Sequence, residues 1–215
     1  MEINGLYKLS RQDEEKLIQT FKIAFASYPK LMTAFPKTAS REAALEATLR
    51  YYVAYDMEFG QAFALDEKIH EGICIVPSRE MHYTEERHRK AGSYSPEYLA
   101  AMDRLTLAEQ RKRLDLFEEL DRLEKQVDIP REHLYADFLG VRPDYQNQGR
   151  GRRLMEAVCR YARGQELPVM LFTNTEADVA FYKSLGFQIV GRVCSGQFGF
   201  TNTYMIREVD FHGAQ

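Results

Sequence analysis

The chain of 215 residues predicts a mixed α/β fold, that is, an α+β arrangement around a mixed sheet. Strand-like and helix-like segments alternate over residues 133–207, and this order predicts a parallel pair of strands in the middle of the sheet. A short strand, two helices and a hairpin precede that part. The stretch 77–132 is polar and helix-forming, and it predicts a helical insertion before the fourth strand. Length and composition fit one domain over residues 1–215.

The first elements follow from spacing and caps. Residues 7–9 end a first strand, and Ser10 is placed to cap a helix that runs to about residue 26, with one apolar stripe four residues apart. Ser40 is placed to cap a second helix. Residues 61–64 and 69–76 read as antiparallel strands around a turn at 66–68. The first stripe is Leu17, Phe21 and Phe25, and the buried side of the second helix is Ala44, Leu45, Leu49, Tyr52 and Val53.

The insertion has two parts. Its start is polar, and residues 83–94 are expected to be its mobile stretch. Ser95 and Pro96 then begin a helix, and Thr106 with Glu109 forms a capping box for another. A stripe of Leu107, Leu114, Phe117, Leu120 and Leu123 follows. The alternating charges predict either a solvated helical face or, as the alternative, an acceptor lid or a partner surface.

The C-terminal elements alternate in type. Strands are expected at 133–141, 168–173, 187–193 and 203–207, and helices at 152–163 and 177–185. Gly186 is placed to end the last helix in a left-handed conformation. The expected result is a parallel pair of strands followed by an antiparallel hairpin.

Composition excludes several classes of protein. The formal net charge of −3 gives no bulk attraction to nucleic acid. Cys74, Cys159 and Cys194 contain no C-x-x-C pair, and the five histidines lack metal-ligand spacing, so no metal site is expected. No window approaches eighteen apolar residues and the first residues do not resemble a leader peptide. A cytoplasmic location with no membrane partner is the expectation.

The most informative segment joins the strand ending at Val141 to the helix after it. Gln146-x-x-Gly149-x-Gly151 forms a glycine-containing loop that runs directly into a helix. The first N–H groups of a helix lack partners and carry partial positive charge, so they bind phosphates. Arg150, Arg152 and Arg153 would add positive charge at the same place. Neither the dinucleotide fingerprint nor the P-loop fits this loop, which leaves an ordinary strand-to-helix turn as the alternative.

This loop resembles the acetyl-CoA signature of the GNAT superfamily of N-acetyltransferases. Phe181-Tyr182 and Gly186-Phe187 are similar to the second signature of that family. The resemblance implies a GNAT-like acyl-CoA N-acyltransferase fold and acetyl-CoA as co-substrate, with no metal. It also implies that the backbone of Leu139, Gly140 and Val141 pairs with the pantetheine arm between splayed strands. The pyrophosphate would lie among Gln146, Asn147, Gln148, Gly149, Arg150, Gly151 and Arg152, and Asn174 would contact the cofactor.

Two side chains are candidates for acid and base. Tyr182 matches the position from which many family members protonate the departing thiolate, and the alternative is a packing tyrosine. Asp137 is a carboxylate in a central strand, which is costly to bury unless it is paired or hydrated. Strict alternation would place it on one face with Tyr135 and Leu139, opposite Phe138. It is expected to act as a general base or as an anchor for the amine, or else to lie at a wet edge or beside an arginine.

The expected partner is an amine, on a small molecule or a peptide, and the protein is expected to be a monomer or a homodimer. Most amines are protonated at pH 7, so transfer needs a base or a water path. The expected activity is acetyl-CoA-dependent N-acetylation by direct attack on the thioester. The alternative is a CoA-binding regulatory module without turnover.

Overall fold

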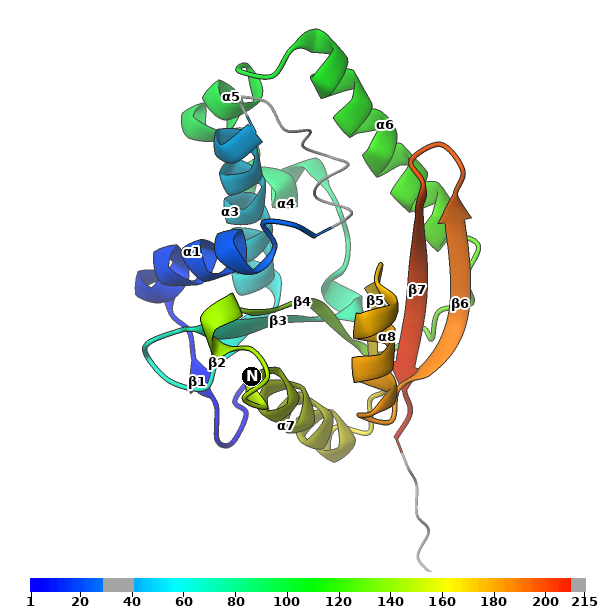
Figure 1. Cartoon of the computed structure of the whole chain (residues 1–215). Helices are drawn as coiled ribbons and strands as arrows, with labels where there is room; N and C mark the ends of the chain where they lie inside the picture. The colour runs from blue at the N-terminus through cyan, green and yellow to red at the C-terminus, as the bar shows by residue number, and fades with distance from the viewer. Residues whose placement is uncertain (29–40, 210–215) are drawn as a thin grey trace, which may run out of the picture.

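The computed structural model describes residues 1–28 and 41–209 (Figure 1). Its sheet has seven strands in the order β1-β2-β3-β4-β5-β7-β6. The strands are β1 Tyr7–Lys8, β2 Gln61–Ala64, β3 Glu71–Pro77, β4 Leu134–Val141, β5 Val169–Thr173, β6 Gln188–Ser195 and β7 Phe200–Arg207. Within the described residues β4 and β5 pair in parallel and the other neighbours pair antiparallel. The predicted mixed sheet with a central parallel pair is confirmed.

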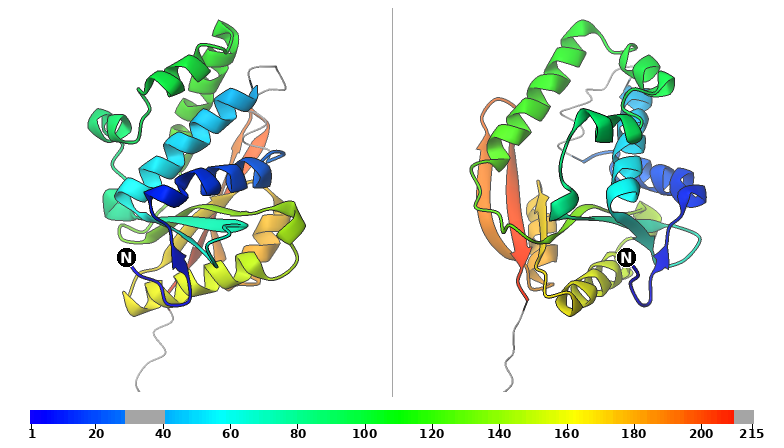
Figure 2. Two further views of the ribbon diagram at one scale, coloured as in Figure 1. Left: turned by 90° about the vertical axis from the view of Figure 1, so that its left-hand side faces the viewer. Right: turned by 180° about the vertical axis from the view of Figure 1, so that it is seen from behind.

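Two helices cover one face of the N-terminal half of the sheet. They are α1 Glu14–Ala24 and α3 Arg41–Phe59, and both contact β3 (Figure 2). Leu17 and Phe21 are fully buried, as the stripe predicts. The start of the first helix differs from the prediction, because Ser10 caps a 3-10 turn, Arg11–Asp13, that precedes α1. The predicted cap at Ser40 lies outside the described residues.

Close packing of α1 on the sheet depends on a small residue in β4. A Cβ atom at Gly140 would lie 2.8 Å from Cδ1 of Phe21, which is closer than van der Waals contact allows. The absence of a side chain at this position lets the helix lie directly on the strand that carries the candidate site.

The opposite face of the sheet is covered by α7, Arg150–Gly164. Its buried side packs against residues from β3, β4 and β5, which forms one of two main apolar clusters. The helix after β5 is α8, Glu176–Lys183, and Gly186 follows it with φ +85°, as expected for a left-handed helix end. The members of α7 in this cluster are Leu154, Met155, Ala157, Val158, Cys159 and Ala162.

The insertion is helical, as predicted. It contains the 3-10 turn η2 Ser78–Glu80 and the helices α4 Glu85–Lys90, α5 Pro96–Met102 and α6 Leu107–Glu124. Ser95 accepts a hydrogen bond from the Tyr98 amide, and Thr106 and Glu109 form the capping box. Helices α4 and α5 contact α3, whereas α6 contacts β6 (Figure 1). The insertion therefore extends from the α3 side of the molecule to the β6–β7 hairpin.

The apolar stripe of α6 has a different phase from the predicted one. Leu107 is 83% exposed and Leu114 is 50% exposed, so these two positions were assigned wrongly. Leu116 and Leu123 are buried, and Leu120 packs on the same cluster. These three lie at i, i+4 and i+7, which is the spacing of one helical face. Within the described residues, every helix is too short or too polar to cross a bilayer.

Candidate functional site

A cavity of about 750 Å³ opens where the central strands separate. The parallel ladder between β4 and β5 contains the pairs Leu134–Val169 and Tyr135–Met170, whereas β4 continues to Val141. The peptide groups of β4 beyond Tyr135 that face β5 are therefore not paired with it. All six residues from Ala136 to Val141 line the cavity. The two strands thus separate beyond Tyr135, as the predicted splay of the fourth and fifth strands requires.

A β-bulge places Asp137 in the cavity wall. Cys74 of β3 pairs with Phe138 and Ile75 pairs with Ala136, so Asp137 has no partner position on β3. Phe138 stacks on Phe21 beneath α1 with a ring separation of 5.6 Å, while Asp137 contacts Asp56 of α3. Asp137 and Phe138 therefore point to the same face of the sheet, the one that α1 and α3 cover.

Leu139 lies on the other side of the sheet from Phe138, packed against the cluster under α7. The prediction that Leu139 shares a face with Asp137, opposite Phe138, was wrong. It failed because strict alternation does not survive a bulge. Tyr135 does line the cavity together with Asp137, as alternation predicts.

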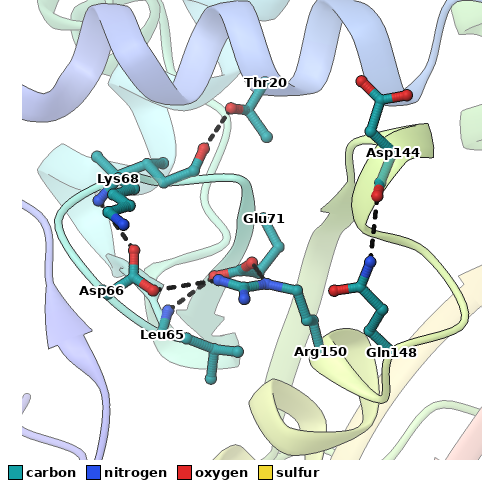
Figure 3. A network of polar contacts seen from close by, with 9 residues as sticks. Thr20, Leu65, Asp66, Lys68, Glu71, Asp144, Gln148 and Arg150 are labelled. Atoms are coloured by element: carbon teal, nitrogen blue, oxygen red, sulfur yellow. Dashed lines mark hydrogen bonds and ion pairs between the residues drawn. The ribbon is translucent and has the colours of Figure 1, made fainter.

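The loop after β4 holds a conformation that presents the start of α7. Asn147 and Gly149 have φ values of +59° and +74°, and Gly149 is the N-cap residue of α7 without a side-chain cap. Gln146 donates from Nε2 to the Val141 carbonyl at 3.0 Å. Gln148 donates to the Asp144 carbonyl at 3.1 Å (Figure 3). These bonds hold the loop, and the uncapped N–H groups at the helix start are suited to an anion.

The position of Gly151 leaves room in the first turn of this helix. A Cβ atom there would lie 3.5 Å from Cγ2 of Val141, an ordinary contact. A small side chain would therefore be tolerated by the protein itself, and only a bulky or charged one would reach into the space in front of the loop.

The side chains of two loop arginines serve other partners. The Arg150 guanidinium forms ion pairs with Glu71, which is fully buried, and with Asp66 at 3.2 Å (Figure 3). Arg152 donates to the Ser184 hydroxyl at 2.6 Å and lies 3.4 Å from Glu156. The expectation that these two side chains add free positive charge at the loop is thus corrected. Their contribution to an anion site would come from backbone N–H groups.

Tyr182 lines the cavity from α8. Its ring packs edge-on against Phe181 and Phe187, at centroid distances of 5.1 and 5.6 Å. Burial raises the pKa of the Tyr182 phenol above its usual value, and the negative charge of Asp178 raises it further. The phenol therefore stays protonated and is a hydrogen-bond donor. The raised pKa makes full proton transfer to a thiolate less favourable than for a free tyrosine.

A hydroxyl network lies between β5 and α8. Asp178 accepts hydrogen bonds from the hydroxyls of Thr173 at 2.9 Å and Thr175 at 2.7 Å. The Tyr28 hydroxyl lies 3.1 Å from the Thr173 hydroxyl and accepts from the Asn174 amide at 3.1 Å. Sequence reasoning missed Tyr28, because it lies 145 residues from Thr173 and in no motif.

Asn174 points to β7. Its Nδ2 donates to the Thr201 carbonyl at 2.9 Å and to the Asn202 side chain at 2.6 Å. Asn202 lines the cavity, whereas Asn174 is absent from its wall. Asn174 therefore holds β5 to β7 beside the cavity.

Aromatic side chains form much of the cavity wall away from the loop. Burial raises the pKa of Tyr51 and Tyr52, and raises the pKa of Tyr204 to about 12. These phenols are neutral at pH 7, and each presents an apolar ring with a hydroxyl group that can form hydrogen bonds. The aromatic members of the wall are Phe25, Tyr28, Tyr51, Tyr52, Tyr83, His88, Phe117, Tyr135, Phe138, Phe172, Tyr182 and Tyr204.

A second carboxyl group lies behind Asp137. Asp56 is 2% exposed, and burial together with the charge of Asp137 raises its pKa well above the usual value. It contacts the Cys74 thiol, whose pKa burial also raises. Sequence reasoning missed Asp56, although an acidic residue among apolar positions of a helix was a visible signal.

The arrangement suits transfer of a group to an amine. An open strand edge, a carboxylate and a phenol line one cavity, and Gln146, from the loop that leads to the uncapped start of α7, lines it as well. In the described part of the chain, no cluster of three or more His, Cys, Asp or Glu side chains could hold a metal ion.

Comparisons with known proteins agree with this geometry. Residues 116–189 match the family model of the acetyltransferase (GNAT) domain. The N-alpha-acetyltransferase RimI of Mycobacterium tuberculosis is 43% identical over 53 residues. The matched segment is 25% of this chain and about a third, 34%, of RimI.

Solved structures show the fold over almost the whole chain. A Corynebacterium glutamicum structure described as histone acetyltransferase HPA2 and related acetyltransferase has a TM-score of 0.66 at 13% identity, with 99% of this chain and 100% of that chain covered. Arylalkylamine N-acetyltransferase 2 from Aedes aegypti has a TM-score of 0.65 at 11% identity, with 95% and 98% covered.

Proposed function

This chain is a member of the GNAT superfamily, and from this we propose that it is an acetyl-CoA-dependent N-acetyltransferase. The acceptor would be a primary amine of a small molecule or a protein, and its nitrogen would attack the thioester directly. The observation that carries this proposal is the cavity: the open edge of β4, Asp137 and Tyr182 all line it. Reactants held together in one cavity gain several kcal/mol of the barrier from proximity, about 7–11 kcal/mol in the best intramolecular cases.

Acetyl-CoA fits this site through backbone groups. We propose that its pantetheine arm lies along residues 139–141, where the β4 ladder to β5 has ended. Residues 146–152 would surround the pyrophosphate, with N–H groups of the α7 start as donors. The left-handed Gly149 and the uncapped first turn support this assignment. Asn174 is proposed only as a support for β5 beside the cofactor, because its side chain is engaged with β7.

Asp137 is proposed as the general base or as the anchor of the amine. It lies in the wall that the acceptor would meet, beside the open edge of β4. The proton of the ammonium group passes to the carboxylate, the amine nitrogen bonds to the thioester carbon, and the carbon–sulfur bond breaks. The nitrogen then loses a second proton, which ends on the departing thiolate, so that the products are the amide and free CoA thiol. The bound co-substrate supplies the activated acetyl group.

Tyr182 is proposed as the donor that stabilises the departing thiolate. Its raised pKa keeps the O–H in place and favours a hydrogen bond to sulfur. A hydrogen bond to a charged group contributes about 1.5–3 kcal/mol. That contribution is sufficient for a catalytic role without complete proton transfer.

The acceptor would enter over aromatic walls. One similar protein is an N-alpha-acetyltransferase and one similar structure is that of an arylalkylamine N-acetyltransferase. Both kinds of acceptor present a primary amine that Asp137 could bind. We propose that α6 and the region around Tyr83 border the acceptor end, since Phe117, Leu120 and Tyr83 line the cavity opposite the loop.

Release of free CoA tests the proposal. Purified protein with acetyl-CoA is assayed by thiol release over a panel of small amines and peptides, including peptides with free α-amines. The wild type is expected to release CoA with at least one acceptor, and Asp137→Asn to reduce that rate. Binding of acetyl-CoA without amine-dependent release over the whole panel would favour the alternative, a regulatory CoA-binding module.

A further inference from the structure

Asp56 is the strongest unexplained polar group of the described residues. It lies on α3 behind Asp137, 2% exposed, and its Oδ2 atom has no hydrogen-bond partner. It forms no ion pair in the described part of the chain. A carboxylate in such a position would be strongly destabilising unless it held a proton.

Among residues 1–28 and 41–209, no positively charged side chain compensates the charge of an ionised Asp56. Its neighbours on β3 and β4 are a thiol and a carboxyl group, Cys74 and Asp137. Tyrosines of α3 and of the segment after η2 face it as well, and they are neutral at pH 7. The titratable groups whose charge interacts with Asp56 are Cys74, Asp137, Tyr51, Tyr55 and Tyr83.

We infer that Asp56 is a positioning residue that holds a proton toward Asp137, so that the two carboxyl groups carry one negative charge between them. This inference rests on the proposed function for the role of Asp137. The bulge in β4 brings the two groups together by turning Asp137 toward α3. Asp137 then presents its negative charge to the cavity from a fixed orientation.

The proton count of the reaction stays balanced. Before transfer the pair holds one proton, on Asp56. The ammonium group of the acceptor gives its proton to Asp137, which leaves a neutral pair and a neutral amine. The nitrogen–carbon bond then forms as the carbon–sulfur bond breaks, the nitrogen loses a second proton to the departing thiolate to give the amide and free CoA thiol, and the Asp56 proton does not leave. Closely spaced carboxyl groups are known to share protons in this way, because two adjacent charges repel.

Two substitutions separate the protonated state from the ionised one. Asp56→Asn retains the shape and a donor N–H, so it imitates a protonated acid. Asp56→Leu removes the polar group. Asp115→Asn on α6 is the control, because Asp115 is paired with the exposed Arg111 and lies outside the cavity wall. The folded state of each variant is checked by thermal unfolding, and acetyl-CoA affinity by calorimetry.

The pH profile of kcat/KM gives the decisive comparison. Asp56→Asn is expected to keep the acidic limb of wild type within a few tenths of a unit and kcat/KM within about threefold. Asp56→Leu is expected to move that limb upward by about one unit, since Asp137 loses a donor, and to lower kcat at unchanged acetyl-CoA affinity. An acidic limb that falls in Asp56→Asn would mean that Asp56 is ionised, and identical limbs in all variants would mean that it does not act on Asp137. Either result overturns the inference.

A measurement without catalysis separates this inference from the proposed function. Infrared difference spectra of wild type and Asp56→Asn at pH 7 should show a protonated carboxyl C=O band that only wild type has. If no amine releases CoA but this band is present, the proposed function fails while the protonated state of Asp56 stands. Absence of the band in a folded wild type refutes the protonated pair regardless of activity.

Discussion

At the scale of single residues, the two carboxyl groups and the phenol show how environment assigns roles. Asp56 and Tyr182 are both held in their protonated forms by burial, although one is an acid with a low ordinary pKa and the other a weak acid. Asp137 lies between the buried layer and the cavity. The chemistry proposed for it therefore depends on its neighbours more than on its residue type.

The stability of the protein should depend on pH through Asp56. Its folded-state pKa is raised, so its stabilising contribution is present below the unfolded-state pKa, about 3.9, and is lost as pH rises toward the folded-state value. Asp56→Asn removes this loss. We expect Asp56→Asn to unfold at a higher temperature than wild type at pH 7, with the difference shrinking toward pH 4. Thermal unfolding at several pH values measures this, and a constant difference would contradict it.

Tyr182→Phe tests the role of the phenol. It removes one hydroxyl while the ring contacts with Phe181 and Phe187 remain possible. A lost hydrogen bond to a charged leaving group lowers kcat by about 10- to 150-fold, the equivalent of about 1.5–3 kcal/mol. Acetyl-CoA affinity by calorimetry should hardly change. A variant with wild-type kcat would assign Tyr182 to packing alone.

At the scale of elements, α7 and its loop combine two functions. The ion pair between Arg150 and the fully buried Glu71 fastens the first turn of the helix to β3 (Figure 3). The backbone N–H groups of the same turn are the ones proposed to bind the pyrophosphate. An ion pair with one fully buried member is costly to break, because the remaining charge stays unpaired.

Arg150→Ala and Arg153→Ala should therefore have different effects on the free energy of unfolding. Arg150→Ala leaves Glu71 buried without its ion-pair partner and should lower the free energy of unfolding by about 3–5 kcal/mol. Arg153 is exposed, so Arg153→Ala should change stability by less than about 0.5 kcal/mol. Chemical denaturation measures both. Equal effects would show that the guanidinium of Arg150 does not hold the helix.

Gly151→Glu tests the anion site at the start of α7. The position accepts a Cβ atom without a close contact, so the fold should persist. A carboxylate at the helix start would repel a pyrophosphate and occupy its space. We expect acetyl-CoA affinity to fall at least tenfold by calorimetry, with Gly151→Ala as the milder control. Unchanged affinity in the folded Glu variant would remove the basis for a pyrophosphate site there.

At the scale of the whole molecule, the insertion connects two sides of the cavity. Its early helices lie on α3 and its long helix lies on β6 (Figure 2). Tyr83, Phe117 and Leu120 from this segment line the cavity. A segment anchored on both sides can border an acceptor without being part of the sheet. Its helices carry few apolar contacts at the start and more along α6.

Hydrogen exchange should divide the insertion into two parts. Residues 83–94 should exchange fast in the free protein and slow down when acceptor and CoA bind together, because they border the acceptor end. Residues 110–124 should be protected throughout, since Leu116 and Leu123 are buried. Equal protection of both parts in the free protein would make the insertion a fixed structural element.

The sequence by itself determined the mixed sheet, the helical insertion with its caps, and the glycine loop before α7. These features depend on local signals, namely periodicity, capping residues and turn residues, which act over a few positions. Only the tertiary structure decided the bulge at Asp137, the phase of the α6 stripe, the partners of Arg150 and the contact with Asp56. Each of these depends on residues far apart in the chain: Arg150 meets Glu71 from 79 positions away, and no local pattern reports such a pairing. The fold was therefore readable from spacing, whereas the electrostatics of the site arise from packing of distant elements.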